Sequence, residues 1–342
     1  MNEKYFCMIH SSYISVIASF LLNTSIISQS LEDRNVFEKF IRSEHFDERT
    51  LNLRFDPEVS VHINSPSKNN FESTKKTLLI LYALPNGNSI EWTIGKKLEP
   101  GNDWHFDIQH IGAQTRFLRE HYKDANIIIA YLMTDGKSWP AWRRKTENNH
   151  LVIKSLVDSL INLFKPYEVK LVLSGHSGGG SFIFGFLNSA EKIPNNVERI
   201  TFLDSNYGHE DSIKHGDKIF EWLRESGDHY LSVIAYDDRD VMINGKNIVS
   251  PTGSTYYKSK MMKERLEKDF KFTDESDTSF TRYTTLKRRV QFRLKENPNV
   301  EIFHTVLVER NGFIQSILSG TEYEGKNYKF WGERSYEEWI VE

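Results

Sequence analysis

The pentapeptide Gly175-His176-Ser177-Gly178-Gly179 contains residue types that could carry out chemistry. A serine hydroxyl is a weak nucleophile unless the backbone presents it beside a base, and a tight strand-to-helix turn can do this only where its neighbours lack bulky side chains. The apolar residues 169–173 predict a buried strand before the serine, and residues 181–188 predict a buried helix after it. The backbone N–H of Gly178 would then lie at the positive end of that helix, where it could stabilise an oxyanion.

A glycine-rich turn of this kind could instead hold a phosphate. A P-loop requires a lysine directly after its glycines, and Ser181 stands there instead. The order of strand, turn and helix therefore favours a nucleophilic serine.

This order of elements resembles the nucleophile elbow of the α/β-hydrolase superfamily, and the resemblance extends over roughly residues 75–320. Apolar runs at 77–83, 126–133, 197–203 and 230–236 alternate with helical patterns at 104–122, 151–164 and 213–226. Such alternation predicts an α/β fold with a doubly wound, mostly parallel sheet. Short alternating pieces at 51–55 and 59–63 predict an N-terminal strand extension of the sheet.

The resemblance implies an acid that follows the strand at 230–236. Ala235, Asp238 and Val241 have the spacing that the family shows around this residue, so Asp238 is the predicted acid, with Asp237 and Asp204 as alternatives. Such an acid holds the tautomer of a histidine and stabilises its imidazolium form.

The resemblance also implies a histidine after the last strand, which the sequence predicts at 299–308. The turn that would follow this strand contains no histidine, so His304 is the candidate base. A strand that continued to residue 308 would leave His304 too deep to reach Ser177, whereas a strand that ended near residue 303 would place it in the loop. His209 and His176 are possible substitutes, and Gln315 cannot accept a proton at neutral pH.

A second oxyanion donor is expected from the loop after the strand at 77–83. In the family this loop supplies a backbone N–H, and Asn86 and Gly87 lie in a turn-forming sequence there. The alternative is an ordinary surface turn. Farther along the chain, Trp139 and Trp142 could line a substrate cleft or could equally pack within a compact loop.

Composition limits the function classes. A net charge of −3 gives no reason to expect nucleic acid as a partner. Residues 241–295 hold 13 Lys and Arg against 6 Asp and Glu, which indicates a possible basic cap or insertion before the last strand, or a solvated helix with a linker. His105 and His110 are five residues apart, which does not place two metal ligands on one helical face.

The first 28 residues predict a secretory signal peptide. The uncharged run at 13–22 has the length of a signal h-region, and small residues follow before Gln29. The only cysteine, Cys7, lies inside this segment, so we expect no disulfide or thiol chemistry in the mature chain, 29–342, which we expect to be a single domain without a stable membrane span. The expected location is periplasmic or extracellular.

Together these patterns predict an exported serine hydrolase that needs no metal or cofactor and cleaves an ester of a small molecule, glycan or peptide, or less readily an amide. The alternative is a binding protein that has kept the hydrolase fold without a properly placed base. The sequence does not distinguish among ester substrates.

Overall fold

A computed structural model describes residues 36–243, 245–247, 249–250 and 252–341. The predicted signal peptide lies outside these residues. Within the described ranges, no helix combines the length and apolar character that crossing a membrane requires.

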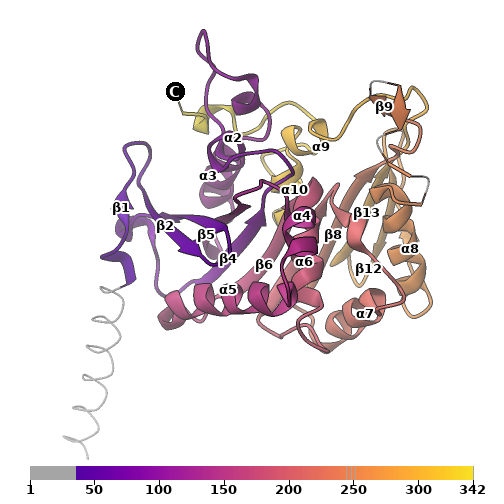
Figure 1. The fold of residues 1–342 in the computed structure, drawn as a ribbon, viewed down its shortest axis with the longest axis horizontal. Coiled ribbons are helices and arrows are strands. Elements are labelled where there is room, and N and C mark those ends of the chain that lie inside the picture. Colours follow the sequence, from indigo (N-terminus) through magenta and orange to yellow (C-terminus); the bar gives the residue numbers. More distant parts are fainter. Residues whose placement is uncertain (1–35, 244, 248, 251, 342) are drawn as a thin grey trace, which may run out of the picture.

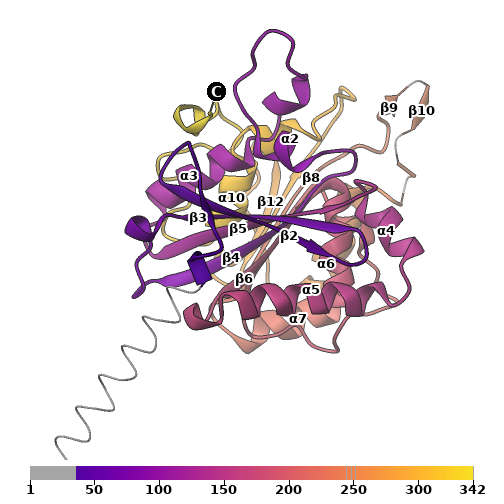
Figure 2. The same ribbon diagram turned by 60° about the vertical axis from the view of Figure 1, so that its left-hand side comes forward.

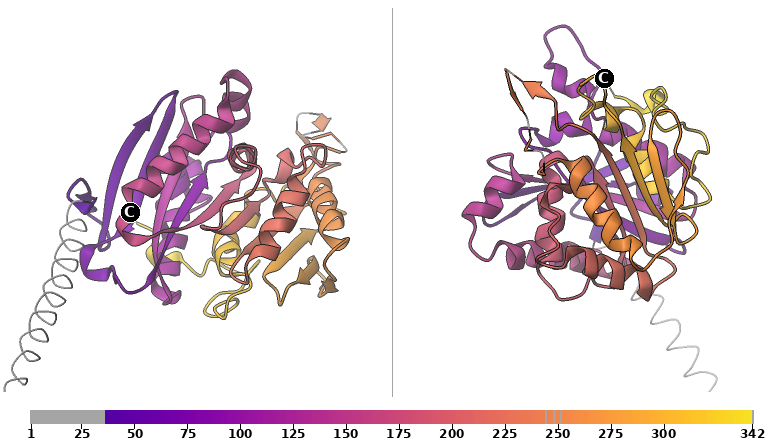
Figure 3. Two further views of the ribbon diagram at one scale, coloured as in Figure 1. Left: turned by 90° about the horizontal axis from the view of Figure 1, so that it is seen from below. Right: turned by 90° about the vertical axis from the view of Figure 1, so that its right-hand side faces the viewer.

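One twisted sheet of eleven strands runs through the structure in the order β1-β2-β3-β5-β4-β6-β7-β8-β13-β12-β11 (Figure 1). The six strands from β5 to β13 are parallel, and β1–β3 at one edge and β11–β12 at the other are antiparallel additions. Figure 3 shows these additions at opposite ends of the sheet. The strands are Ile41–Arg42 (β1), Glu48–Phe55 (β2), Val59–Pro66 (β3), Lys76–Ala83 (β4), Ala125–Thr134 (β5), Lys170–His176 (β6), Val197–Leu203 (β7), Tyr230–Tyr236 (β8), Thr273–Asp274 (β11), Thr281–Thr285 (β12) and Val290–Lys295 (β13).

Helices cover both faces of the sheet (Figure 2). The helices are Ile90–Ile94 (α2), Ile111–His121 (α3), Trp139–Lys145 (α4), Asn149–Leu163 (α5), Gly180–Leu187 (α6), His215–Glu225 (α7), Thr255–Glu267 (α8), Val306–Glu309 (α9) and Gly312–Leu318 (α10), and a small separate hairpin joins Met242–Ile243 (β9) to Lys246–Asn247 (β10). Strand side chains alternate between two cores: on β4, Leu79 and Leu81 face α5 and α6, whereas Leu78 and Ile80 face α3 and α10. The mixed, mostly parallel sheet with N-terminal antiparallel strands is the doubly wound α/β arrangement that the sequence predicts.

The last parallel strand differs from the prediction. It is β13, inside the segment 241–295, and the predicted strand at 299–308 is instead a loop followed by the short helix α9. The basic segment is therefore not an insertion before the last strand, because it supplies that strand together with α8, β11 and β12. The β-branched residues near 305–308 form a helix because Leu307 and Val308 pack into the α3/α10 core, and this packing overrides their strand propensity.

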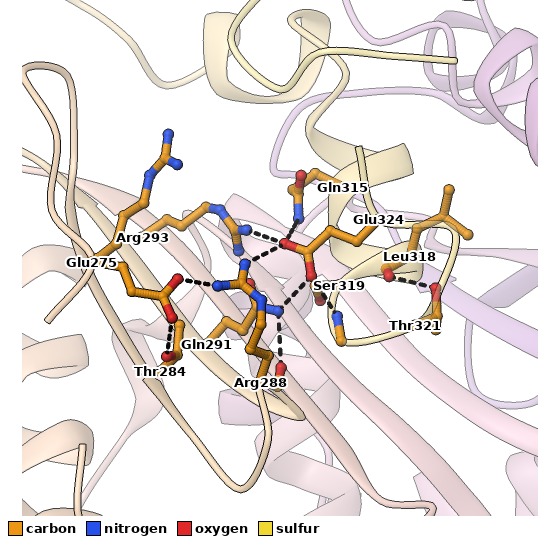
Figure 4. A network of polar contacts seen from close by, with 12 residues as sticks. Glu275, Thr284, Arg288, Gln291, Arg293, Gln315, Leu318, Ser319, Thr321 and Glu324 are labelled. Atoms are coloured by element: carbon orange, nitrogen blue, oxygen red, sulfur yellow. Dashed lines mark hydrogen bonds and ion pairs between the residues drawn. The ribbon is translucent and has the colours of Figure 1, made fainter. Parts of the chain in front are cut away.

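A buried ion network joins β13 to the chain that follows α10 (Figure 4). Arg293 on β13 is almost fully buried, and the Glu324 carboxylate accepts a hydrogen bond from its Nη2 at 2.6 Å. Glu324 also accepts from Gln291 Nε2 and from the backbone N–H of Gly320, each at 2.8 Å. Burial alone would raise the pKa of Glu324, but Arg293 and these donors outweigh it and lower the pKa to about 2. Because Gln315 on α10 also donates to Glu324, the network fixes α10 against β13.

We predict that Glu324→Gln destabilises the fold at pH 7 by roughly 3 kcal/mol, because the wild-type pKa of about 2 lies well below the ordinary value of 4.5. The stabilisation is fully present above pH 4.5 and is lost as the pH falls toward 2, so the difference between variant and wild type should shrink at pH 3. Urea unfolding at both pH values measures this. Glu322→Gln, at an exposed neighbouring carboxylate, is the matched control, and an equal loss in both variants would contradict the assignment.

Candidate active site

Ser177 stands on a strained turn between β6 and α6. Its backbone has φ 52°, a left-handed conformation that a serine adopts only where its surroundings enforce it. A single turn of 3-10 helix, Ser177–Gly179, leads directly into α6. The side chain is half-buried at the carboxyl end of a central parallel strand, where α/β sheets place their sites. The structure thus forms the predicted elbow.

Glycines allow the backbone to approach neighbouring strands closely at this turn. A Cβ on Gly179 would lie 2.1 Å from the carbonyl oxygen of Ala83 at the end of β4. A Cβ on Gly180 would lie 1.7 Å from the carbonyl oxygen of Ser205, just after β7. The elbow is therefore held between the ends of β4 and β7, and neither position has space for a side chain.

His304 lies in the loop between β13 and α9 and pairs with a buried carboxylate. Its Nδ1 hydrogen bonds to Oδ2 of Asp204 at 2.5 Å. Asp204 directly follows β7, is fully buried, and also accepts a hydrogen bond from the Thr255 hydroxyl. With the Nδ1 proton directed at Asp204, Nε2 carries the lone pair that a general base requires.

The carboxylate that pairs with His304 is Asp204, one of the two alternatives from the sequence, and not the predicted Asp238. Asp238 follows β8 as expected, but it makes no hydrogen bond to His304, and neither of its carboxylate oxygens has a partner among the described residues. Burial, reinforced by the charge of Asp204, raises the pKa of Asp238 to about 7. Asp237, the other alternative, forms an ion pair with Arg239.

His176 holds His304 in place instead of substituting for it. Its Nε2–H donates to the backbone carbonyl of His304 at 3.0 Å, and the two ring centroids are 4.5 Å apart. Burial, followed by the neighbouring His304, keeps the pKa of His176 well below its usual value, so this ring stays neutral. Since His176 directly precedes Ser177, these contacts bring His304 to the elbow. No hydrogen bond joins Ser177 Oγ to His304, and such bonds are often long before substrate binds.

Two other polar residues considered from the sequence lie in other contacts. His209 is buried and hydrogen bonds to Asp211 at 3.2 Å, and burial lowers its pKa. Gln315 is buried between Glu324 and the hydroxyl of Tyr328. Neither hydrogen bonds to Ser177.

The predicted oxyanion loop lies directly beside the elbow. A Cβ on Gly178 would meet the Asn86 side chain at 2.1 Å, so the amide of Asn86 lies over the Gly178 backbone. The N–H of Gly87 donates to the carbonyl of Lys137 at 2.8 Å. The Gly87 N–H is thus already paired in this structure, and the oxyanion roles of Asn86, Gly87 and Gly178 stay predictions.

A pocket of about 480 Å³ opens at the elbow. No acidic or basic side chain lines it; its lining residues are Asn86, Pro140, Ser177, Gly178, Ser181, Tyr207, Gly208 and Val249. Trp139 and Trp142 are fully buried on α4, where their indole N–H groups donate to the carbonyls of Leu132 and Pro57. The two tryptophans therefore support the packing of α4, and the cleft interpretation does not hold for them.

Comparison with known proteins gives structural similarity alone. No family model and no curated protein matches the sequence. The chain is similar to a thermostable esterase, with 12% identity and a TM-score of 0.47, over 83% of this chain and 64% of the esterase. It is also similar to the feruloyl esterase module from Clostridium thermocellum (12% identity, TM-score 0.46, 85% of this chain and 99% of the module) and to the acetyl xylan esterase from Aspergillus awamori (12%, 0.39, 72% and 92%). Sequence identities of 12% and TM-scores below 0.5 do not extend to activity or substrate.

We predict that Asp204→Asn lowers kcat/KM for p-nitrophenyl acetate on the order of a thousandfold, because the amide can no longer hold the Nδ1–H tautomer of His304. Asp238→Asn should change it by less than about tenfold. Steady-state kinetics on both variants, with circular dichroism to verify folding, makes the comparison. A larger loss in Asp238→Asn than in Asp204→Asn would show that Asp238, and not Asp204, is the acid.

Proposed function

We propose that this chain is a serine hydrolase that cleaves an ester through an acyl-enzyme on Ser177. The observation that carries the proposal is the hydrogen bond between His304 and the buried Asp204, beside a serine on a strained elbow. The proposal combines this carboxylate and imidazole with a serine from a neighbouring strand end, because such a set of groups has a known chemical use in acyl transfer.

In the first half of the reaction, Ser177 Oγ attacks the ester carbonyl carbon while His304 Nε2 takes the hydroxyl proton. The tetrahedral oxyanion that forms would accept hydrogen bonds from the backbone N–H of Gly178 and the backbone N–H of Asn86. Collapse of this intermediate breaks the bond to the alcohol oxygen, which receives its proton from the His304 imidazolium. Asp204 stabilises the imidazolium throughout and keeps its orientation.

In the second half, His304 takes a proton from water, whose oxygen attacks the acyl carbon. The second tetrahedral intermediate releases the carboxylic acid, and the proton returns to Ser177. The atoms balance as the hydrolysis of one ester by one water. An amide would follow the same steps but requires protonation of a poorer leaving group, so an ester is the better substrate for this site.

The rival function is ligand binding on a hydrolase fold without acyl transfer. The missing hydrogen bond between Ser177 and His304 is the observation that favours it. The two functions predict opposite reactivity for Ser177, so one experiment separates them.

A fluorophosphonate probe should label the wild-type protein, and Ser177→Ala should lose both the labelling and the hydrolysis of short p-nitrophenyl esters. Ser181→Ala is the matched control, because Ser181 lines the same pocket and precedes no strained turn. Labelling is read by intact mass spectrometry. If the folded wild-type protein does not react with the probe, the hydrolase proposal fails.

We also propose that the protein is exported, on the basis of its amino-terminal sequence. Expression of the full chain in a bacterial host should give a mature form outside the cytoplasm that begins at Gln29, as determined by N-terminal sequencing. Retention of an uncleaved chain in the cytoplasm would rule this out.

A further inference from the structure

The ammonium group of Lys295, the last residue of β13, lies among three aromatic rings. It is 4.8 Å from the centre of the Phe303 ring, 5.0 Å from that of Trp331 and 5.6 Å from that of Phe280. These distances are within the range of cation–π attraction. The rings come from the loop after β13, from the chain after α10 and from the residue before β12. Lys295 therefore connects three segments that are separate in the sequence.

The three rings also pack on one another and on the sheet. The Trp331 ring meets those of Phe280 and Phe303 edge to face, with centroids 5.4 and 5.5 Å apart. Phe303 in turn lies 5.9 Å from the ring of Tyr236, which is the register partner of Lys295 on β8. Because each ring has a neighbour of this kind, the cage around the ammonium is fixed in shape.

Trp331 is held in this cage against a backbone preference. Its φ of 66° is left-handed, which is an outlier for a bulky residue. Its backbone N–H donates to the carbonyl of Arg310 at 3.0 Å, and the Arg310 guanidinium lies 4.9 Å from the indole ring. Strain of this kind persists only where the surroundings impose it, and it is often found near functional sites. The position of Trp331 beside Lys295 is thus imposed by the tertiary structure.

The rings are the closest partners of the Lys295 ammonium. No side chain in the described part of the chain forms a hydrogen bond or ion pair with it. Burial lowers the pKa of Lys295, Glu301 and Asp277 oppose this shift from farther away, and Arg310 adds to it. Loss of the ammonium would therefore remove the cation–π contacts without breaking a salt bridge.

The cage closes the loop that carries the candidate base. The chain leaves β13 at Lys295 and returns at Phe303, the residue before His304, and residues 298–302 between them are exposed. The side chain of Asn297 fixes the start of this loop, since its Nδ2 donates to two backbone carbonyls at 2.9 Å. The contact between Lys295 and Phe303 fixes the other end.

We propose that Lys295 is a positioning residue for His304, because its ammonium holds the Phe303 ring and so fixes the end of the 296–305 loop. The imidazole then keeps its Nδ1 on Asp204 and its Nε2 free to act as a base. The effect on catalysis rests on the proposed function, whereas the anchoring of the loop does not. Lys295 lines no part of the Ser177 pocket, so we expect it to affect hydrolysis through the loop.

Lys295→Met tests this role, because it removes the charge and keeps an unbranched side chain. We expect kcat for p-nitrophenyl acetate to fall roughly tenfold while KM stays within about twofold, since a displaced base affects the transition state and not substrate binding. Lys295→Arg keeps the cation and should recover most of the loss. Lys263→Met is the matched control, because the Lys263 ammonium on α8 also lies near two rings, those of Tyr283 at 4.5 Å and Phe272 at 5.6 Å.

A second measurement reports on His304 without any need for hydrolysis. Long-range proton–nitrogen NMR spectra of protein labelled at its histidine nitrogens give the tautomer of each ring, and the His304 signals are assigned by their loss in His304→Gln. The wild type and Lys263→Met should hold the proton on Nδ1 of His304. Lys295→Met should show a mixture of the two tautomers, because the ring no longer stays on Asp204.

The proposal is overturned if the His304 signals of Lys295→Met match the wild type, if an active wild type loses no kcat in this variant, if Lys263→Met changes as much, or if Lys295→Arg is equally impaired. Should circular dichroism show that Lys295→Met is unfolded, Trp331→Leu, which removes another wall of the cage, is judged by the same criteria. If Ser177 is unreactive in the wild type but the tautomer changes in Lys295→Met, the loop anchor is correct and the hydrolytic function fails.

Discussion

A fully buried carboxylate, Asp204, depends on the imidazole of His304 for its main interaction, and this dependence organises the site. An ionised carboxylate without partners is costly in a protein interior. Two hydrogen bonds stabilise the Asp204 carboxylate, one to Nδ1 of His304 in the 296–305 loop and one from the hydroxyl of Thr255 on α8. The first of these also orients the imidazole. Two hydrogen bonds to one carboxylate therefore link the end of β7, helix α8 and the loop after β13.

Close backbone packing sets the other half of the geometry. Gly179 and Gly180 bring the elbow against the ends of β4 and β7, so that Ser177, Asn86 and Asp204 come from three adjacent strands of one sheet. His176 adds a direct hydrogen bond from the elbow to the loop that carries His304. Farther away, the Glu324 network fixes β13 and α10 on either side of that loop. The reactive groups are thus held by rigid elements, as precise positioning requires.

The parts of the fold that depend on local pattern could be predicted from the sequence. The elbow at Ser177 follows from a strand, glycines and a helix in sequence, and the alternation of β4 to β8 with helices gave the parallel sheet. The type of His304 and its place late in the chain make it the candidate base, but the predicted strand around it is a loop in the structure. The alternating residues of β13, with Gln291 and Arg293 facing a core, gave a weaker strand pattern than the β-branched run at 305–308. The buried Arg293 is paired with Glu324, which lies 31 residues later in the chain.

The identity of the acid could not be read from spacing. Asp204 and Asp238 each follow a parallel strand, and both are buried in the structure. Which of them meets His304 depends on the path of the 296–305 loop across the sheet, a tertiary feature with no local sequence signal. The pairing of the Gly87 N–H has the same origin, since its partner Lys137 lies fifty residues later. Neighbouring residues in the sequence predict which polar groups lie near the site. The hydrogen-bond partners of those groups come from distant parts of the chain.

A crystal structure of the protein after reaction with diethyl p-nitrophenyl phosphate tests the central claim most directly. The account predicts a phosphoryl group bonded to Ser177 Oγ, with one of its oxygens within hydrogen-bond distance of the Gly178 N–H and Asn86, and with His304 Nε2 beside the modified serine while Nδ1 remains on Asp204. An unmodified Ser177, or a His304 ring directed away from the adduct, would contradict it.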